Sequence, residues 1–460
     1  MSNLFHVIKD PVHGTMQFTS AENLWVKPFI DSANFQRLRH IKQLGMGDYI
    51  FPGAVHTRFN HCLGCSYVGS QIAQKIGLKD EERQLVVIAC LLHDIGHGPF
   101  SHAFEGVFHN KLIRHELWTP YFLEDYETDA FFSEYNRLNP RHHLTEEKFN
   151  EIANMIMHKP VKRRVLADIV SSQLDADRLD YLLRDSHFCG VRYGEFDFRW
   201  MLHCMTVVRT EEGERLGITY KGVGVTEHYL MARRLLTRNI CHLQKKLAIE
   251  DLLVLLLSSL AESLEHHAPF KHIANTRLGA FLIEANRFNQ AAQKGKTDKL
   301  TKQFLSENYT KYKSLCDYDV YALINQLAEM CDGTPATQIA ARLHHRIMPK
   351  TVRLNVASLD KVEAELQSFK QKYHKKYQDW QLQLIKSPHQ SYSGEDDPIL
   401  VVNEHGTISP LSDYSIMIDA ISDKLEHSAF ISIDKPISED KEVLQFIKTL
   451  VTSPRTAVAL

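Results

Sequence analysis

Histidine and aspartate residues in three separate motifs have the types and order expected of a metal site. His61 ends the motif VHTRFNH, His93 and Asp94 lie side by side in LLHDIGHGPFSH, and Asp177 lies in DADRLDYLLRD. Imidazole nitrogens and carboxylate oxygens suit Mn, Fe, Zn, Ni or Co, and open coordination positions leave room for water and substrate. The combination predicts a divalent transition-metal ion bound by these four residues, although each one alone is more typical of a core or surface position.

The helices that carry these residues decide whether they can meet. His93 and Asp94 are adjacent, so on a helix they point about 100° apart and can reach one ion only at a helix end that faces a cavity. Two glycines and a proline follow directly and predict that the helix ends there. With His61 on an earlier helix and Asp177 on a later one, the ligands would come from three helices, as in the core of a helical bundle.

Helical patterns dominate the rest of the chain. Residues 81–94 carry apolar residues at helical spacing after an acidic start, which is typical of a helix N-terminus. Residues 57–76 and 163–185 have a similar pattern, and residues 225–264 contain no Gly or Pro, which predicts one long helix. Residues 205–221 have the pattern of a β-hairpin. We expect a mainly α protein with a small β-hairpin.

The composition changes after about residue 350. The segment 366–395 is rich in Gln, Lys and Ser, and its stretch SPHQSYSGEDDP predicts an exposed loop. Two short apolar runs, Ile399–Val402 and Phe430–Ile433, alternate with the helix-like stretches 412–424 and 439–450. We therefore divide the chain into a core with its helical extension and a C-terminal α+β appendage without a cluster of catalytic residue types, at residues 1–350 and 351–460.

Composition excludes several classes of protein. The chain has 460 residues, 44% of them hydrophobic, and a formal net charge of −2, so it does not indicate a nucleic-acid partner. Eight cysteines in a chain of this size do not indicate a disulfide scaffold, and Cys62 and Cys65 have the spacing of helix-packing residues. The most hydrophobic run, Leu252–Leu260, is far shorter than the roughly 20 residues that span a bilayer. We expect a buried helix there, no membrane segment and a cytoplasmic location.

Longer motifs resemble a known family. The segments 7–14 (VIKDPVHG), 31–45 (DSANFQRLRHIKQLG), 51–61, 91–106 and 175–190 are similar to the HD-domain dNTP triphosphohydrolases. These include the catalytic core of the vertebrate sterile-alpha-motif and HD-domain enzyme and its bacterial relatives, and the likeness covers roughly the first 350 residues. The resemblance implies an HD-domain helical bundle that splits a dNTP into the deoxynucleoside and inorganic triphosphate. It implies the same four metal ligands, with Mg on the triphosphate as a second ion.

The resemblance also implies a set of catalytic residues that faces the triphosphate and the leaving oxygen. A metal-polarised water would attack phosphorus, and the 5′-alkoxide leaving group would need a proton. A histidine can supply that proton near neutral pH, and we favour His115 over His102 as this general acid. Glu116 or Glu105 would hold the imidazolium in place. The catalytic set is His97, His102, Glu105, His115 and Glu116.

Phosphate and sugar contacts would complete the substrate site. Guanidinium groups offer several donors to a dense oxyanion, and the family's contacts to the sugar come from a Tyr, an Asp and a Gln. The family has Lys in place of Arg178, and it has Tyr where this chain has Cys241, which leaves the exclusion of ribonucleotides open. The substrate-binding set is Gln43, Arg58, Arg178, Tyr181, Asp185 and Arg233.

A second nucleotide site is implied as well. In the vertebrate relative a guanine nucleotide bridges subunits of a tetramer and activates it, so the resemblance implies a GTP or dNTP effector and a homotetramer. Lys9 departs from that pattern, because the relative has Asn there. The effector set is Val7, Asp31, Gln36, Arg39, Arg346 and Lys350.

Two other functions remain open from the sequence. One is a different HD phosphohydrolase, such as a nucleotidase, a phosphodiesterase or a single-strand nuclease. The other is a catalytically silent nucleotide-binding protein. The complete metal set argues against a silent protein. The sequence has no basic track with aromatic platforms, which argues against a nuclease.

Overall fold

The computed structural model describes residues 7–17, 24–295, 297–354 and 359–452. The prediction of a mainly α fold is confirmed. Within the described residues, no helix is long and apolar enough to cross a bilayer. The helices are α1 (Lys27–Ile30), α2 (Ala33–Gln36), α3 (Arg58–Lys75), α4 (Asp80–Leu92), α5 (His102–Glu105), α6 (His115–Glu124), α7 (Asp129–Leu138), α8 (Glu146–Ile156), α9 (Arg164–Val170), α10 (Ala176–Cys189), α11 (Phe198–Cys204), α12 (Val223–Leu236), α13 (Gln244–Ser263), α14 (Lys271–Ala274), α15 (Arg277–Ala292), α16 (Thr297–Lys313), α17 (Asp317–Met330), α18 (Pro335–His344), α19 (Leu359–Lys372), α20 (Ile416–Ile421) and α21 (Lys441–Thr452).

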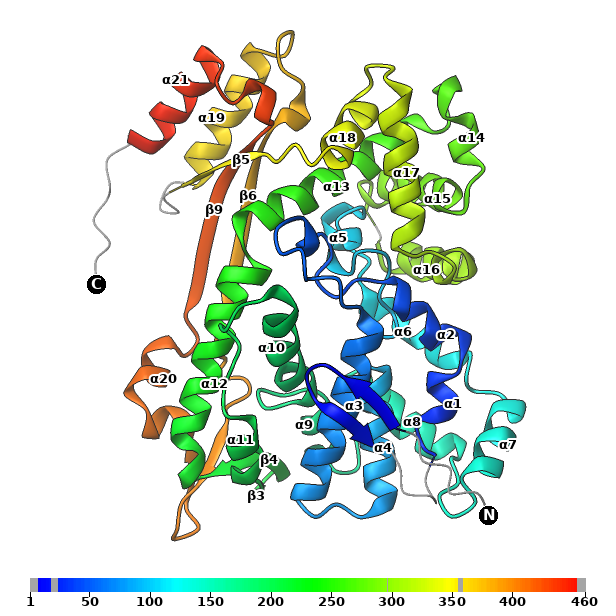
Figure 1. The fold of residues 1–460 in the computed structure, drawn as a ribbon, viewed down its shortest axis with the longest axis vertical. Helices are drawn as coiled ribbons and strands as arrows, with labels where there is room; N and C mark the ends of the chain where they lie inside the picture. Colours follow the sequence, from blue (N-terminus) through cyan, green and yellow to red (C-terminus); the bar gives the residue numbers. More distant parts are fainter. Residues whose placement is uncertain (1–6, 18–23, 296, 355–358, 453–460) are drawn as a thin grey trace.

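A central bundle of α3, α4, α8, α9 and α10 carries the predicted metal motifs (Figure 1). The helices expected over residues 57–76 and 81–94 are confirmed as α3 and α4. At the start of α3, Asn60 Oδ1 accepts hydrogen bonds from the backbone N of Thr57 at 3.1 Å and from its Oγ1 at 2.9 Å. Three acidic residues in the first turn of α4 suit the positive end of its dipole. Local sequence signals therefore fix where the metal-bearing helices begin.

The prediction of one continuous helix over residues 163–185 is wrong, because this range forms two helices, α9 and α10. Ser171 is extended, with φ −152° and ψ 103°. Asp175 then accepts a hydrogen bond of 2.7 Å from the backbone N of Arg178 and caps α10. Serine and aspartate offer the backbone partners that compete with a helix interior, which is why the pattern breaks at this point.

The single long helix expected over residues 225–264 is also wrong. Between α12 and α13 the chain makes one π-helical turn, Thr237–Cys241, and Leu243 is extended with φ −64° and ψ 125°. His242 in this break hydrogen-bonds to Ser387 on a C-terminal strand, 2.5 Å away. Long-range packing thus overrides the helical propensity of a segment without Gly or Pro. The buried helix expected over the run Leu252–Leu260 is confirmed within α13.

Three small sheets accompany the helices, and the hairpin expected over residues 205–221 is confirmed as β3 and β4. In Figure 1, β6 and β9 run along the side of the molecule from α19 and α21 towards α20. The sheet orders are β1-β2, β3-β4-β7-β8 and β5-β9-β6. The strands are β1 (Val7–Asp10), β2 (Gly14–Gln17), β3 (Met205–Thr210), β4 (Gly213–Thr219), β5 (Lys350–Arg353), β6 (Leu382–Gln390), β7 (Leu400–Val402), β8 (Ile408–Pro410) and β9 (Leu425–Ile433).

The exposed loop expected for SPHQSYSGEDDP is wrong in its first part. Ser387–Gln390 complete β6 and pair with β9. Tyr392 is buried, and its hydroxyl accepts a hydrogen bond of 3.0 Å from the backbone N of Ile399. The polar composition concealed a strand whose end is largely open to water: Ser387 is buried and His389 half-buried, while Pro388 and Gln390 are exposed. The two apolar runs that follow are confirmed as parts of β7 and β9.

The C-terminal segment is joined to the bundle through a shared sheet. Strand β4 of the hairpin pairs in parallel with β7, whose Val401 lies in the same core cluster as the bundle. A second, smaller cluster lies between α19, α21 and the sheet of β5, β6 and β9, and includes Leu382 and Ile431. The division into residues 1–350 and 351–460 stays a prediction.

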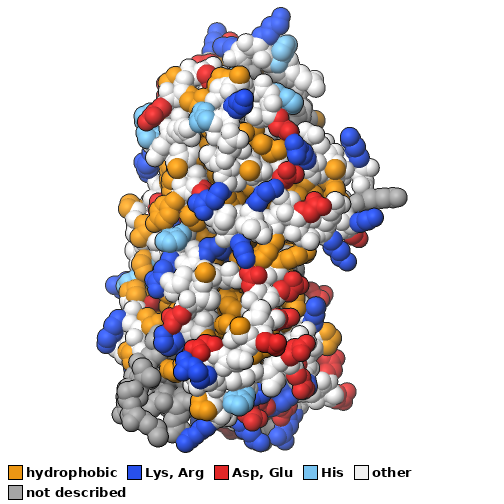
Figure 2. Space-filling view, turned by 90° about the vertical axis from the view of Figure 1, so that its right-hand side faces the viewer, with side chains coloured by type: hydrophobic (Ala, Val, Ile, Leu, Met, Phe, Trp, Pro, Cys, Tyr) orange, Lys and Arg blue, Asp and Glu red, His pale blue; other side chains and the backbone are white. Residues whose placement is uncertain are grey.

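Charged side chains of both signs are intermixed on the face that carries α7 (Figure 2). On α7 itself, Arg137 donates two hydrogen bonds of 2.7 Å to Glu134. Such a mixed surface does not form a continuous basic band for a nucleic-acid backbone on this face.

Candidate metal centre and active-site cavity

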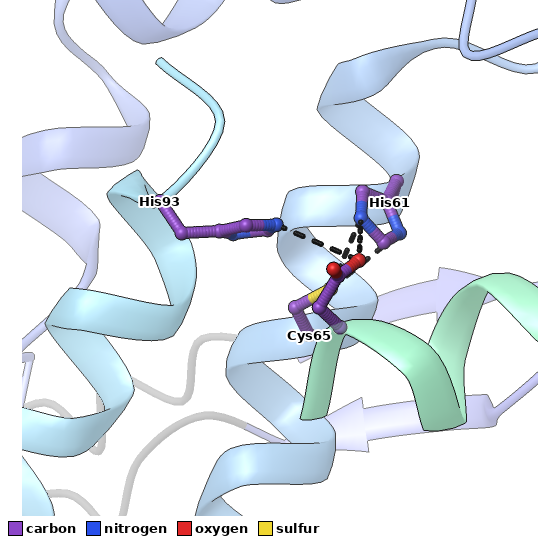
Figure 3. A group of neighbouring side chains, drawn as sticks. His61, Cys65 and His93 are labelled. Carbon is purple, nitrogen blue, oxygen red and sulfur yellow. Dashed lines mark hydrogen bonds and ion pairs between the residues drawn. The ribbon is translucent and has the colours of Figure 1, made fainter. Parts of the chain in front are cut away.

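The four predicted metal ligands converge at the end of α4. Asp94 Oδ2 lies 3.6 Å from His61 Nε2 and 3.5 Å from His93 Nε2. Asp177 Oδ1 lies 3.0 Å from His61 Nε2 and 3.8 Å from His93 Nε2. Figure 3 shows His61 and His93 turned towards one carboxylate from two helices. Two donors about 2.1 Å from one ion and roughly 90–110° apart lie about 3.0–3.4 Å from each other. One separation lies in this range and the other three, 3.5–3.8 Å, are slightly longer, so small side-chain movements would let one divalent ion contact all four residues.

Hydrogen bonds on the far side of each imidazole fix which nitrogen can bind a metal. His61 Nδ1 donates to Asp180 Oδ2 at 2.8 Å, and His93 Nδ1 donates to the backbone carbonyl of Cys90 at 2.8 Å. The lone pair of each Nε2 is therefore turned towards Asp94 and its neighbours. His93 Nε2 is buried and has no hydrogen-bond partner among the described residues. This arrangement, in which an outer partner orients a ligating histidine, is common in metal sites.

Cys65 lies one helical turn after His61, and its Sγ is within 4.8 Å of ligand atoms of His61, His93 and Asp177 (Figure 3). Its Sγ is 3.4 Å from both ring nitrogens of His61. Equal distances place the sulfur over the face of the ring and away from the line of the Nε2 lone pair. Cys65 therefore supports the ring by packing, as the sequence predicted for both cysteines of this pair, and both are buried free thiols.

The electrostatics of the cluster favour a bound cation. Burial opposes ionisation of Asp94, but the charge of Arg58 and the nearby imidazoles hold the pKa of Asp94 well below its usual range. Burial would likewise lower the pKa of His61, but hydrogen bonds to Asp177 and Asp180 raise it to about 10. In the protein without metal, a proton on His61 takes the place that a cation would fill, so we expect metal affinity to rise with pH.

Three histidines and a glutamate form a second cluster beside the metal ligands. The rings of His97 and His115 are stacked, with centroids 3.7 Å apart and an interplanar angle of 15°. His115 Nδ1 donates to Glu105 Oε1 at 2.8 Å, and His102 Nδ1 lies 3.3 Å from the same oxygen. Glu116 is exposed and its Oε2 is 3.4 Å from His115 Nδ1, so Glu105 is the closer partner.

The loop after α4 brings this second cluster against the metal ligands. A Cβ at Gly96 would overlap the backbone oxygen of His115, so only glycine allows the loop to pass so close to the start of α6. Phe100 and Ser101 have positive φ, 53° and 54°. Residues other than glycine tolerate this conformation at a cost of about 1–3 kcal/mol each, and surrounding contacts must hold them there. Phe100 N donates to Asp317 at 2.7 Å as one such contact.

A cavity of about 930 Å³ opens onto both clusters. Asp94 and Asp177 face it, while His61 and His93 lie deeper in the protein. The cavity is large enough for a nucleotide-sized ligand. Histidines of the second cluster and four of the substrate residues line it, namely His97, His102, His115, Gln43, Arg58, Tyr181 and Asp185.

The substrate residues differ in how they are held. Asp185 is fixed by His56, whose Nε2 donates to its Oδ1 at 2.8 Å. Gln43 is buried, and its Oε1 has no hydrogen-bond partner among the described residues. Burial raises the pKa of Tyr181 to about 12, so its hydroxyl stays a donor at neutral pH. An oriented carboxylate, a free amide oxygen and a phenol can together read hydroxyl groups of a sugar.

Two predicted phosphate contacts lie outside the cavity lining. Arg178 is paired with Asp175, and Arg233 donates to Gln173 Oε1 at 2.7 Å. Their roles stay predictions. Cys241 does line the cavity, at the end of the π-helical turn.

The predicted effector residues also lie outside the cavity. Gln36 donates to the carbonyl of Ile30 at 2.7 Å, and Arg39 donates to Gln36 at 2.6 Å. Arg346 donates to the carbonyl of Tyr49 at 2.8 and 2.9 Å. Asp31 is ion-paired with Lys27, Val7 is exposed on β1, and Lys350 begins β5.

Sequence reasoning missed the wall of the cavity opposite the metal. That wall comes from α13 and from β6, including Lys246, Ile385 and Ser387. No motif marked these positions, because they become neighbours only through the break at His242 and the pairing of β6 with β9. Asp180 was also missed, although it lies three residues after Asp177 on the same helix and could have been found by that spacing.

Comparison with known proteins agrees with this geometry. Residues 58–185 match the HD domain family, and this range contains all four predicted metal ligands. The chain contains an HD domain. It runs from the start of α3 to Asp185 on α10, so the central bundle is the HD domain.

The matches to curated relatives cover only part of this chain and part of each relative. The chain is 37% identical over 233 residues to the uncharacterized protein YwfO of Bacillus subtilis, covering 49% of each chain. It is 34% identical over 251 residues to human deoxynucleoside triphosphate triphosphohydrolase SAMHD1, covering 47% of this chain and 38% of that protein. The chain thus spans about half the length of the curated relatives it matches. A crystal structure of a phosphohydrolase from Bacteroides thetaiotaomicron is 25% identical and has a TM-score of 0.72, covering 94% of this chain and 100% of that chain.

Proposed function

We propose that this protein is a metal-dependent phosphohydrolase that splits deoxynucleoside triphosphates into the deoxynucleoside and inorganic triphosphate. The observation that carries the proposal is that two of the predicted metal ligands, three further histidines and the predicted sugar contacts line one cavity, with the other two predicted ligands directly behind it. The names of the human and Bacteroides relatives, a dNTP triphosphohydrolase and a phosphohydrolase, support it.

His61, His93, Asp94 and Asp177 would hold the ion. A divalent ion bound there supplies activation of water and neutralisation of charge on phosphate oxygens. Arg58, which is paired with Asp94 and donates to Ser101 Oγ at 2.9 Å, fixes that carboxylate and presents positive charge to the cavity. Arg58 would thereby offer positive charge to a phosphate group of the substrate.

His115 is the proposed general acid. Its Nδ1–H is held by Glu105, so its Nε2 is free to protonate the 5′ oxygen as the bond from that oxygen to the α-phosphorus breaks. Burial, together with the charges of Arg58 and His115, holds the pKa of His97 well below its usual range. His97 therefore stays neutral, and its ring stacks on that of His115. His102 shares Glu105 and is largely exposed, so it suits a contact to the outgoing triphosphate.

Gln43, Tyr181 and Asp185 would bind the sugar. Cys241 faces the same cavity with a smaller side chain than the family's tyrosine, so the protein would discriminate weakly against a 2′-hydroxyl. Asp31, Gln36, Arg39, Arg346, Lys350 and Val7 would bind a GTP or dNTP effector in a homotetramer. Because all six lie outside the cavity and the polar groups of Gln36, Arg39 and Arg346 already bond to neighbours, we expect a neighbouring subunit to complete that site.

Analysis of reaction products tests the proposal. Purified protein with Mn²⁺ would be incubated with dGTP, dATP, dCTP, TTP and GTP, each with and without a second nucleotide, and the products separated by anion-exchange chromatography. We expect deoxynucleoside and triphosphate as the first products, and measurable hydrolysis of GTP. Release of dGMP or dGDP first would assign the protein to another class of HD phosphohydrolase.

A further inference from the structure

A buried network of charged groups connects the N-terminal hairpin to the metal ligand His61. The hairpin of β1 and β2 is joined by the motif DPVHG, which contributes Asp10 and His13. Both side chains lie against α10, where they meet Asp180 and Arg184. These side chains are almost completely excluded from solvent, with exposed fractions of 4% for His13 and for Asp10 and 0% for Asp180 and Arg184.

Asp180 is the shared acceptor of the network. Its Oδ2 accepts from His61 Nδ1 at 2.8 Å and from Arg184 Nε at 2.8 Å. Its Oδ1 accepts from His13 Nε2 at 2.6 Å and from Arg184 Nη2 at 2.9 Å. Four donors occupy the lone pairs of one carboxylate, so the position of His61 depends on the other three.

Arg184 extends the network back to the hairpin. Its Nη1 donates to Asp10 Oδ2 at 2.8 Å, and Asp10 Oδ1 accepts the backbone N–H groups of Val12 and His13 at 2.9 Å. Asp10 thus shapes the turn that presents His13 to Asp180. Arg184 thus joins the two carboxylates, and the carboxylate of Asp180 lies behind His61, where such a partner strengthens an imidazole as a metal ligand.

Gly64 on α3 provides independent support for this arrangement. A Cβ at Gly64 would overlap the carboxylate of Asp180 and the guanidinium of Arg184. The helix that carries His61 therefore leaves room for the network one turn later. This glycine costs helix propensity at a buried position, and the close approach of the charged pair explains why that cost is tolerated.

We propose that Asp10 and His13 are positioning residues of the metal site, and that they act through Asp180 to hold His61 with Nε2 turned towards the ion. This inference rests on the proposed metal-dependent function. It gives the hairpin, which lies outside the matched HD domain, a direct part in metal binding. A buried ion-pair network with only a structural role would affect stability alone.

The test measures Mn²⁺ affinity by isothermal titration calorimetry in the full chain. His13→Phe keeps an aromatic ring against Tyr67 and Phe198 but removes the donor to Asp180. We expect the dissociation constant for Mn²⁺ to rise about 10-fold, within the 10- to 100-fold range of such outer partners. His13→Gln keeps a donor and should recover most of the affinity.

Asp10→Asn provides the second variant, and Asp168→Asn is its matched control. Asp168 is equally buried and paired with Arg215 at 2.8 Å, away from the metal ligands. We expect both variants to lower the unfolding temperature and only Asp10→Asn to weaken Mn²⁺ binding. Unchanged Mn²⁺ affinity in His13→Phe and Asp10→Asn would overturn the inference and leave the proposed function standing. Wild-type protein that binds no divalent ion would overturn both.

Discussion

The proposed metal site was predicted from the residues themselves and the proposed effector site only from the resemblance, and the structure holds the two sets of side chains differently. The predicted metal ligands come from three sequence motifs, and the Nε2 atoms of His61 and His93 lie 3.0–3.8 Å from the carboxylates of Asp94 and Asp177. The buried Nε2 of His93 has no hydrogen-bond partner among the described residues. The effector residues are half-buried or exposed and hydrogen-bond to near neighbours, as Arg39 does to Gln36 and Arg346 to Tyr49.

This contrast shows which kind of site can be recognised from the structure of a single chain. Burying two carboxylates and two imidazoles together is unfavourable unless a ligand or a proton compensates them, so their convergence itself indicates a site. Exposed polar residues that satisfy one another have no such requirement. They become a site only if a ligand or a second subunit offers more than they already have.

The largest loss of activity is expected from Asp94→Asn, which removes one of the proposed metal ligands. The variant keeps the size of the side chain but removes the charge that faces His61, His93 and Arg58. A metal contributes several kcal/mol to the transition state, so turnover of dGTP should fall about 1,000-fold or more. Metal content, measured by plasma emission spectrometry, should fall with it.

The control for this variant is Asp168→Asn, which also breaks a buried pair with an arginine. Asp168 accepts from Arg215 and from the backbone N of Leu216, and burial raises its pKa. We expect lower stability but normal turnover and metal content. If Asp94→Asn retains wild-type turnover after chelation and return of the metal, the metal-hydrolase proposal is wrong.

A smaller effect is expected from His115→Ala, which separates chemistry from binding within the cavity. Loss of one general acid typically lowers the rate about 100- to 10,000-fold. We expect that loss in kcat with little change in KM, because the metal ligands remain. Glu105→Gln should weaken the same step less, since the amide oxygen still accepts from His115 Nδ1. An effect confined to KM would mean that His115 binds phosphate and transfers no proton.

Particular residues show which parts of the fold and of the site could be predicted from the sequence. Local signals located α3, α4 and the end of α4, because capping residues and glycines act over a few positions. The break at His242 and strand β6 could not be found in this way. The break depends on Ser387, which lies 145 residues after His242, and β6 depends on pairing with β9, which lies more than 30 residues further along the chain. The metal residues were found because their chemistry is distinctive, whereas the opposite wall of the cavity uses ordinary Ile, Lys and Ser side chains.

The smallest change in activity is expected from substitutions at the predicted effector residues, which test whether these residues form a site at all. If a neighbouring subunit completes the site, a nucleotide that binds the assembled state better than the free subunit shifts the population towards it. A typical coupling of about 1–3 kcal/mol corresponds to roughly 5- to 150-fold activation. The measurement is the ratio of the dNTP hydrolysis rates with and without GTP. In Arg39→Ala this ratio should fall to about one.

Arg209→Ala is the control for that ratio, because Arg209 is an exposed arginine on the β3–β4 hairpin. Arg39 also stacks on Phe59, with its Cζ 3.5 Å from the ring centroid, so Arg39→Lys is needed to separate packing from recognition. Lysine keeps the charge but cannot offer two parallel donors to a base, so activation should still be lost. Light scattering should show the oligomer growing with GTP in the wild type but not in either Arg39 variant. A monomer that is fully active on one pure dNTP, with or without GTP, would mean that Asp31, Gln36 and Arg39 form only a helix surface.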